Sequence, residues 1–457
     1  MRQDHEVIIV GAGPAGIFAA IELLRSGVRD IAIIEKGKPI ECRSCPVHEH
    51  GCIRCPSCDI MTGWGGAGAF SDGKLTLTGE VGGWLGEYIG AARLDSLIEY
   101  TDGVWLEFGA DPQVHGPDAK TAARLKRQAT SAGMTLTPMT IRHIGSDRSP
   151  QVLGAMHDYL VAEGVDVRTK TSVTSFLVAD GQVRGVVLGD GSELHAKAVI
   201  VAPGREGAEW LASQAVLLGI ALSSNQVDVG VRVETPASVM EALTRDLYEA
   251  KLTYLSTTFG DRVRTFCMNP YGEVTTESYG DVVTVNGHSY AERRTPYTNF
   301  AVLVSQKFTH PFREPITYGR SIAHLANLLG ESILVQRLGD LKAGRRSTPE
   351  RIAQSIVRPT MPGATPGDLA SVLPYRHLTD ILEFLEAMEL LAPGVAAPST
   401  LLYGVEVKFY SSRLDLDATL QTPVRGLYAV GDGAGVTRGL VQSAASGVVA
   451  ARAIAGA

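Results

Sequence analysis

The chain has 457 residues, of which 45% are hydrophobic and 20% charged, a composition that indicates a folded globular protein and excludes a disordered one. Its net charge of −7 and the lack of a long basic run argue against a nucleic-acid partner. The sequence contains no run of 18 apolar residues and does not open with a signal-peptide pattern, so we expect a cytoplasmic protein with no membrane segment.

The N-terminal residues predict a βαβ unit: a buried strand at 6–10, a helix at 14–24 and a second strand at 30–35. The turn after the first strand is Gly11-Ala12-Gly13-Pro14-Ala15-Gly16. In such a motif the first glycine permits a tight turn, the second admits a pyrophosphate, and the third lets the helix pack on the strand. The helix N-terminus faces the phosphates, and Glu35 can accept hydrogen bonds from the adenosine ribose. This unit predicts a dinucleotide site.

Five of the six cysteines lie between Cys42 and Cys58. Cys52, Cys55 and Cys58 have the C-x₂-C-x₂-C spacing with which one loop can hold an iron–sulfur cluster, and Cys45 is the favoured fourth ligand. Zinc held by four thiolates is the second interpretation, a redox dithiol the third, and inert thiols the last. We therefore predict a metal centre on Cys45, Cys52, Cys55 and Cys58.

The middle of the chain predicts a helix at 150–163, short strands at 165–168, 173–178, 183–188 and 193–196, and a buried strand at 198–202. The region 219–402 mixes strands and helices, including an amphipathic helix at 378–391, and has no dinucleotide signature of its own. A last strand is expected at 426–430 and a last helix at 440–455. A dedicated NAD(P)H domain is therefore not expected.

Between that last strand and helix lies Gly431-Asp432-Gly433-Ala434-Gly435. Only 22 residues follow it, too few for a second βαβ unit. The segment resembles the C-terminal GD motif of FAD-binding oxidoreductases of the two-dinucleotide-binding-domain superfamily. The resemblance implies that Asp432 holds the ribityl or pyrophosphate part of FAD. It also implies that the last helix points its N-terminus at the N1–C2=O edge of the flavin, where it stabilises the anionic reduced ring.

Two further segments are similar to the same superfamily. The segment 199–204 resembles its third signature, with Pro203 in place of the usual threonine, so a hydroxyl contact is lost while the backbone approach survives. Val173 matches a position whose backbone contacts the adenine. The glycine run 63–70 follows the cysteines, and the resemblance implies that it passes over the pyrophosphate or the flavin ring, with Ser71 and Lys74 as further candidates. For Lys74, a surface cation at a helix start is an equally good interpretation.

A narrower resemblance is carried by residues 63–75, 285–289, 404–408 and 431–440, which are similar to mostly uncharacterised bacterial FAD-dependent dehydrogenases. It covers nearly the whole chain and implies FAD, but it is silent on the substrate. The expected FAD-binding residues are Gly11, Gly13, Pro14, Ala15, Gly16, Glu35, Lys36, Gly65, Gly66, Ser71, Lys74, Val173, Ala202, Gly204, Gly431, Asp432, Gly439 and Leu440.

These observations predict an α/β fold: a discontinuous Rossmann-type FAD-binding domain at 1–218 and 403–457, with a cysteine-rich loop at 42–58, and an inserted α+β substrate domain at 219–402. The expected reaction is hydride transfer between a small organic substrate and flavin N5, with an unidentified electron acceptor or donor. Arg438 is the first catalytic candidate and His288 the second, although a lone histidine is more often structural.

Three alternatives remain open. A flavin-dependent monooxygenase shares the terminal signatures, but its usual central Asp-Gly motif is replaced here by Ala202-Pro203-Gly204-Arg205. A flavin enzyme acting on nucleic acid is disfavoured by the acidic charge balance. The third alternative is a redox sensor or assembly factor that works through its flavin and cysteines without turnover of a small molecule.

Overall fold

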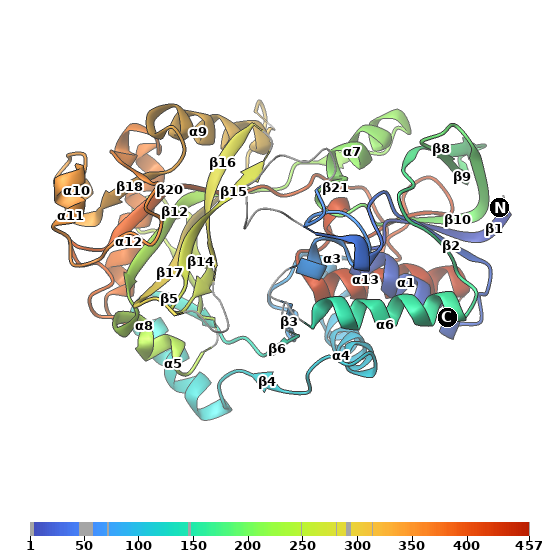
Figure 1. Ribbon diagram of the computed structural model, residues 1–457, viewed down its shortest axis with the longest axis horizontal. Helices are drawn as coiled ribbons and strands as arrows, with labels where there is room; N and C mark the ends of the chain where they lie inside the picture. The colour runs from blue at the N-terminus through green and yellow to red at the C-terminus, as the bar shows by residue number, and fades with distance from the viewer. Residues whose placement is uncertain are drawn as a thin grey trace. The chain divides into compact units, whose positions relative to one another are not determined.

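The computed structural model describes residues 4–44, 58–70, 73–144, 148–247, 249–279, 281–288, 294–312 and 314–456 (Figure 1). The chain forms two compact units. The first contains residues 1–115, 140–225 and 411–457, and the second contains 116–139 and 226–410. The α/β fold class predicted from the sequence is confirmed. Among the described helices, none has both the length and the apolar character needed to cross a bilayer.

The unit boundaries differ from the predicted domain limits at three places, of which the first is the segment 219–225, which belongs to the first unit. Residues 116–139 belong to the second unit, because strand β5 (Met134–Thr137) pairs with β13 (Lys251–Leu255) of that unit. Residues 403–410 also belong to it, because strand β20 (Leu401–Lys408) is continuous across the predicted boundary and pairs with β12 (Val227–Pro236).

The first unit is built on a seven-stranded sheet in the order β7-β2-β1-β10-β9-β8, with β22 also paired to β10. Strands β7, β2, β1, β10 and β22 are mutually parallel, and β9 and β8 form an antiparallel extension. The central strands are apolar and buried, as expected for parallel strands covered on both faces. The strands are β1 (Asp4–Val10), β2 (Ile31–Ile34), β7 (Asp166–Arg168), β8 (Val173–Ala179), β9 (Gln182–Leu188), β10 (Glu193–Val201) and β22 (Leu427–Ala429).

Two helices, α1 (Pro14–Arg25) and α13 (Leu440–Ala455), lie side by side against this sheet (Figure 1). Helix α1 starts with proline at its first position, where the missing N–H costs nothing, and ends before Gly27, whose φ is +91°. The two helices approach closely because Gly447 lies against α1: a Cβ there would stand 2.0 Å from the Ala15 carbonyl oxygen. This packing brings the two helix N-termini to the same end of the sheet.

The remaining elements of the first unit surround this core, and they include the three-stranded sheet β3-β6-β4 and the pair β11–β21. The glycine run 63–70 contains a short 3₁₀ helix, η2. The elements are η1 (Ile40–Cys42), η2 (Gly66–Phe70), β3 (Lys74–Thr76), α3 (Leu85–Ile89), α4 (Ala91–Glu107), β4 (Val114–His115), β6 (Ile141–His143), α6 (Ser149–Ala162), α7 (Ala208–Leu217), β11 (Leu222–Ser223), β21 (Arg413–Leu414) and η4 (Asp432–Ala434).

The second unit has an eight-stranded sheet in the order β19-β18-β20-β12-β17-β14-β13-β5 and a separate hairpin, β15–β16. Every neighbouring pair except β18–β19 is antiparallel. Its further elements are α5 (Ala119–Ser131), α8 (Ala237–Thr244), β14 (Arg262–Asn269), β15 (Glu273–Tyr279), β16 (Val282–His288), β17 (Tyr297–Gln306), α9 (Pro315–Gly330), β18 (Leu334–Arg337), α10 (Leu338–Lys342), α11 (Pro349–Ala353), β19 (Thr365–Pro366), η3 (Leu369–Ser371) and α12 (Tyr375–Met388).

A buried ionic network crosses this second sheet. Arg232 donates two hydrogen bonds of 2.7 Å to the Glu406 carboxylate, and both side chains are fully buried. Arg232 also donates to Asn286 Oδ1 at 3.3 Å. Lys408 Nζ lies 2.8 Å from Glu277 Oε2 and 3.3 Å from Glu406 Oε1. Two sequence motifs 120 residues apart, one carrying Asn286 and one carrying Glu406 and Lys408, therefore meet in one network.

Candidate flavin-binding site

The carboxyl ends of four parallel strands meet at one edge of the first sheet, which is where open α/β sheets bind ligands. The loops that leave these ends carry Gly11, Glu35, Ala202 and Gly431. Hydrogen bonds join the ends pairwise, from Gly11 N–H to Ile34 O (2.8 Å), from Ala202 N–H to Val10 O (2.7 Å) and from Val430 N–H to Val201 O (3.0 Å). Motifs from both ends of the sequence are thus brought together at a single edge.

The three motif glycines meet different surroundings. A Cβ on Gly11 would stand 2.2 Å from the Ala202 carbonyl oxygen, and one on Gly16 would stand 2.0 Å from the Gly11 oxygen. Both glycines are therefore required by packing. A Cβ on Gly13 would meet only the Cα of Gly66, at 4.0 Å. Packing thus leaves space at Gly13, as the expected approach of a pyrophosphate requires.

Glu35 organises the loops around this edge. Its buried carboxylate accepts backbone hydrogen bonds from Ala12 (2.8 Å), Gly37 (2.8 Å) and Gly63 (3.0 Å). A carboxylate offers about four lone-pair sites, so capacity for a ribose hydroxyl remains. The sequence predicted only the ribose contact and missed these three amides. Glu35 therefore has a structural role in addition to its predicted one.

Helices α1 and α13 both begin at this edge, and glycines precede them, Gly13 and Gly439. Within the described part of the chain, neither helix start is capped by a side chain. The first N–H groups of a helix need acceptors and carry a partial positive charge. Because no side chain caps these two helix starts, their N–H groups are suited to bind the phosphates of an anionic cofactor.

Asp432 lies in the turn between β22 and α13. Its carboxylate accepts a hydrogen bond from Thr437 Oγ1 (2.8 Å), and Arg205 Nε stands 4.0 Å away. Burial raises the pKa of Asp432, and the charges of Arg205 and Arg438 oppose that rise. A partly desolvated carboxylate gains from further hydrogen-bond donors, such as the hydroxyl groups of a ribityl chain. The residues at this edge therefore fit FAD.

Two family models match this chain. One, described as an FAD binding domain, matches residues 4–49. The other, described as FAD-dependent protein, C-terminal domain-like, matches residues 226–409, which is nearly the whole main segment of the second unit.

The chain carries an FAD-binding domain and is similar to FAD-dependent proteins.

Individual relatives of this chain are distant. It is 27% identical to an uncharacterized protein of Clostridium beijerinckii over 96% of this chain and 79% of the relative. Two solved structures match over nearly their whole length, at low identity and low TM-score. A 3-ketosteroid-Δ4-(5α)-dehydrogenase from Rhodococcus jostii is 14% identical, with 99% and 97% of the two chains covered and a TM-score of 0.45. An L-proline dehydrogenase from P. horikoshii is 11% identical, with 99% and 94% covered and a TM-score of 0.40. Similarities this low indicate no substrate.

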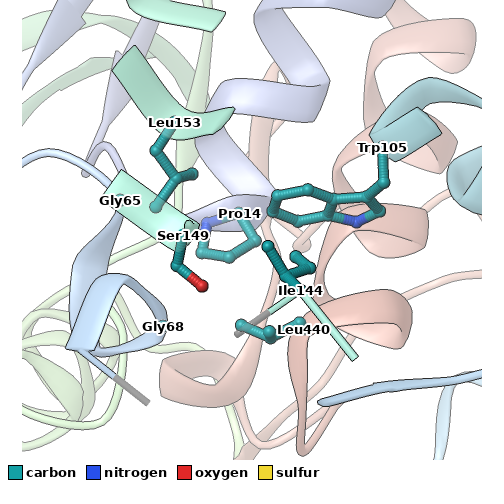
Figure 2. Close-up of a pocket in the computed structure, with 8 residues that line it drawn as sticks. All are labelled: Pro14, Gly65, Gly68, Trp105, Ile144, Ser149, Leu153 and Leu440. Atoms are coloured by element: carbon teal, nitrogen blue, oxygen red, sulfur yellow. The ribbon is translucent and has the colours of Figure 1, made fainter. Parts of the chain in front are cut away.

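A small apolar pocket lies between the two helix starts. Figure 2 shows Pro14 of α1 and Leu440 of α13 at its wall, with Trp105 beside them and Gly65 and Gly68 in the adjoining loop. The pocket has no room for even a water molecule, so it is not itself the cofactor site. Its lining shows that the glycine loop, α1 and α13 converge here.

Three features of this edge were not predicted from the sequence. Buried Arg43 donates to the carbonyl oxygens of Asp59 (2.8 Å), Ile60 (3.0 Å) and Trp64 (2.5 Å), and burial lowers its pKa to about 10. Arg205 lies close to the Asp432 carboxylate. In the sequence, only its position directly after Gly204, at the end of a predicted cofactor-binding segment, could have indicated this contact. The segment 81–84 lies along the GD turn, with Trp84 N–H donating to Val436 O and Arg438 N–H to Gly82 O.

Other predicted residues lie around this edge. Lys36 pairs with Glu206, which connects the loop after β2 to the loop after β10, and partial burial lowers the pKa of the lysine. Val173 begins β8. Lys74 begins strand β3, so its surface-helix interpretation was wrong. Ser71 lies outside the described residues.

The structure describes only part of the predicted cysteine site. Cys45, Cys52 and Cys55 lie outside the described residues, and Cys58 is exposed and forms no disulfide. Among the residues that the structure describes, no group of three or more histidine, cysteine or acidic side chains has the geometry of a metal site.

The two catalytic candidates lie in different units. Arg438 precedes α13 in the first unit. His288 ends β16 in the second, where it is exposed.

Proposed function

We infer that this FAD-binding protein is an oxidoreductase of the dehydrogenase type, which transfers hydride between a small organic substrate and flavin N5. The observation that carries this inference is the convergence of Gly13, Glu35, Asp432 and the start of α13 at the carboxyl edge of one sheet. FAD held there would supply the two-electron chemistry.

The chain's own groups have separate roles in this proposal. The α1 N-terminus neutralises the pyrophosphate charge, and Asp432 accepts hydrogen bonds from the ribityl or pyrophosphate part of the cofactor. The α13 N-terminus stabilises negative charge at the pyrimidine edge of the flavin. Arg438 is proposed to orient an anionic substrate in the first unit. His288 of the second unit is proposed separately as a proton acceptor. The second unit is proposed as the substrate domain.

The test is anaerobic mixing of the purified, FAD-loaded protein with a panel of small alcohols, amines and carboxylates while flavin absorbance is recorded. We expect one class to bleach the flavin. Arg438→Met should lower the rate constant for reduction by that class at least tenfold, about 1.4 kcal/mol, without loss of FAD. Arg425→Met, at an exposed site of the same unit, is the matched control.

Other outcomes separate the alternatives. Oxygen uptake stoichiometric with hydroxylation of a substrate would identify a monooxygenase. Flavin that is reduced by dithionite but by no member of the panel would favour a redox sensor.

We further propose that Cys45, Cys52, Cys55 and Cys58 hold an iron–sulfur cluster or zinc, because their spacing suits four thiolate ligands. In the sequence they lie between Glu35 and the glycine run at the flavin edge, so a redox centre there would be placed to relay electrons.

Metal analysis of anaerobically prepared protein should find iron with sulfide, or one zinc per chain. Cys52→Ser should lower the metal content by more than half, whereas Cys267→Ser, in the second unit, should not. Protein that contains neither metal and in which all five clustered thiols react freely with a thiol reagent would contradict the proposal.

A further inference from the structure

A second pocket lies in the first unit. It is an open groove of about 540 Å³, formed by helix α3, strands β11 and β21, and the residues that follow β21. This volume is within the range of small-molecule sites. Neither the FAD-binding motifs nor the family matches assign it a role.

The lining of this pocket contains both apolar and polar side chains. Leu222 and Leu416, which are half-buried, provide apolar surface, and Leu414 is buried at the wall. Arg413, Tyr88 and Ser223 add polar groups with N–H or O–H donors. Such a lining suits a ligand with apolar faces and hydrogen-bond acceptors at its rim.

Arg413 is held in place at the pocket wall. Its guanidinium lies 5.7 Å from the centre of the Trp84 ring and 5.3 Å from that of Tyr88, and Nη2 donates to Glu87 Oε2 at 2.7 Å. One guanidinium has five N–H groups, so donors remain beyond that ion pair. A fixed, planar donor beside aromatic rings favours a planar ligand.

The charges at the wall disfavour an anion. Arg413 carries the one positive charge of the lining, whereas Glu87 and Asp415 each carry a negative charge. A carboxylate or phosphate ligand would face a net negative wall, and a neutral ligand would not.

The same wall supports the GD turn. A Cβ on Gly435 would stand 2.6 Å from the Ser412 carbonyl oxygen and 2.9 Å from the Arg413 Cα. Trp84 N–H donates to Val436 O at 2.8 Å. The pocket therefore adjoins the outer side of the turn that begins at Asp432.

We propose that this pocket binds a neutral, planar quinone, which accepts the electrons of the flavin. The assignment of the quinone as the electron acceptor rests on the proposed dehydrogenase function. The binding of the quinone to this pocket does not rest on it. Two electrons pass from the reduced flavin to the quinone. The anionic reduced flavin releases one proton to solvent, the two quinone oxygens take up two protons from solvent, and the products are oxidised FAD and a hydroquinone.

The experiment uses FAD-loaded protein and menadione as the probe. Calorimetry measures menadione binding, and anaerobic stopped-flow measures reoxidation of the photoreduced flavin by menadione and by ferricyanide. Ala221→Trp adds an indole at an exposed position of the lining. Val216→Trp, at an exposed position of α7 (68%), is the matched control. Ser223→Phe repeats the test if the indole disturbs folding.

We expect one saturable menadione site. In Ala221→Trp the dissociation constant should rise at least tenfold, and menadione-dependent reoxidation should slow at least tenfold, while the ferricyanide rate stays unchanged. Val216→Trp should behave as wild type. Absence of saturable binding, or wild-type values for both readouts in the pocket-filling variants, would overturn the proposal. Photoreduction needs no substrate, so a failed substrate search leaves both measurements valid.

Discussion

Gly13→Ala should abolish FAD retention while leaving the fold intact. The new methyl group would have only Gly66 Cα within about 4.0 Å, and Gly13 has φ −78° and ψ −179°, an extended conformation open to alanine. A pyrophosphate on the α1 N-terminus would collide with it. We expect at least a 30-fold rise in the FAD dissociation constant, about 2 kcal/mol, and colourless protein after gel filtration.

Two other glycines make this result interpretable. Gly154→Ala, inside α6 with no atom within 4 Å of the new Cβ, should retain FAD and wild-type stability. Gly16→Ala should lose stability as well as FAD, because its Cβ would stand 2.0 Å from the Gly11 oxygen. A yellow Gly13→Ala protein with wild-type FAD affinity would place the pyrophosphate elsewhere. Glu35→Ala is a less selective test, since it also removes three backbone contacts.

Glu406→Gln should strongly destabilise the second unit. The substitution leaves fully buried Arg232 without its carboxylate partner, and it removes one of the two carboxylates near Lys408. Breaking a buried ion pair on one side typically costs about 3–5 kcal/mol. The change should appear as a lower urea midpoint for the second unit.

The four tryptophans, Trp64, Trp84, Trp105 and Trp210, lie in the first unit, so the measurement should follow far-UV circular dichroism, with tryptophan fluorescence as the monitor of the first unit. Glu163→Gln is the control. It breaks the Arg29–Glu163 pair, whose side chains are 64% and 40% exposed, and should cost less than about 1 kcal/mol. An unchanged urea midpoint for Glu406→Gln would show that the network adds no net stability.

The predictable parts of the fold are those with a local signal. The turn 11–16 joins a strand and a helix that are adjacent in sequence, and α13 has the predicted bounds because its apolar pattern is uninterrupted. Strand β10 was predicted as two strands with a break at Lys197. It is one strand, because the side chain of Lys197 points to solvent (79% exposed) while the backbone continues its ladder.

The remaining features depend on contacts between distant segments. Nothing near residues 134–137 indicates that this strand pairs with residues 251–254, so the boundary at 116–139 was missed. The backbone N–H of Gly63 donates to the Glu35 carboxylate, although the two residues are 28 positions apart in the sequence. Arg43 lies in the cysteine-rich stretch, and no sequence feature indicates its buried hydrogen bonds. Sequence motifs located the flavin edge, but the groups that support it could be identified only from the structure.

The division of the chain into units has a consequence for synthesis. The chain passes between the units four times, after residues 115, 139, 225 and 410. A nascent chain therefore exposes every residue of the second unit by 410, whereas the first unit still lacks β22 and α13. The first unit is therefore completed after the second unit on the ribosome. Its nucleotide turn at 11–16 meets Asp432 and the α13 N-terminus only after every residue of the second unit has been synthesised.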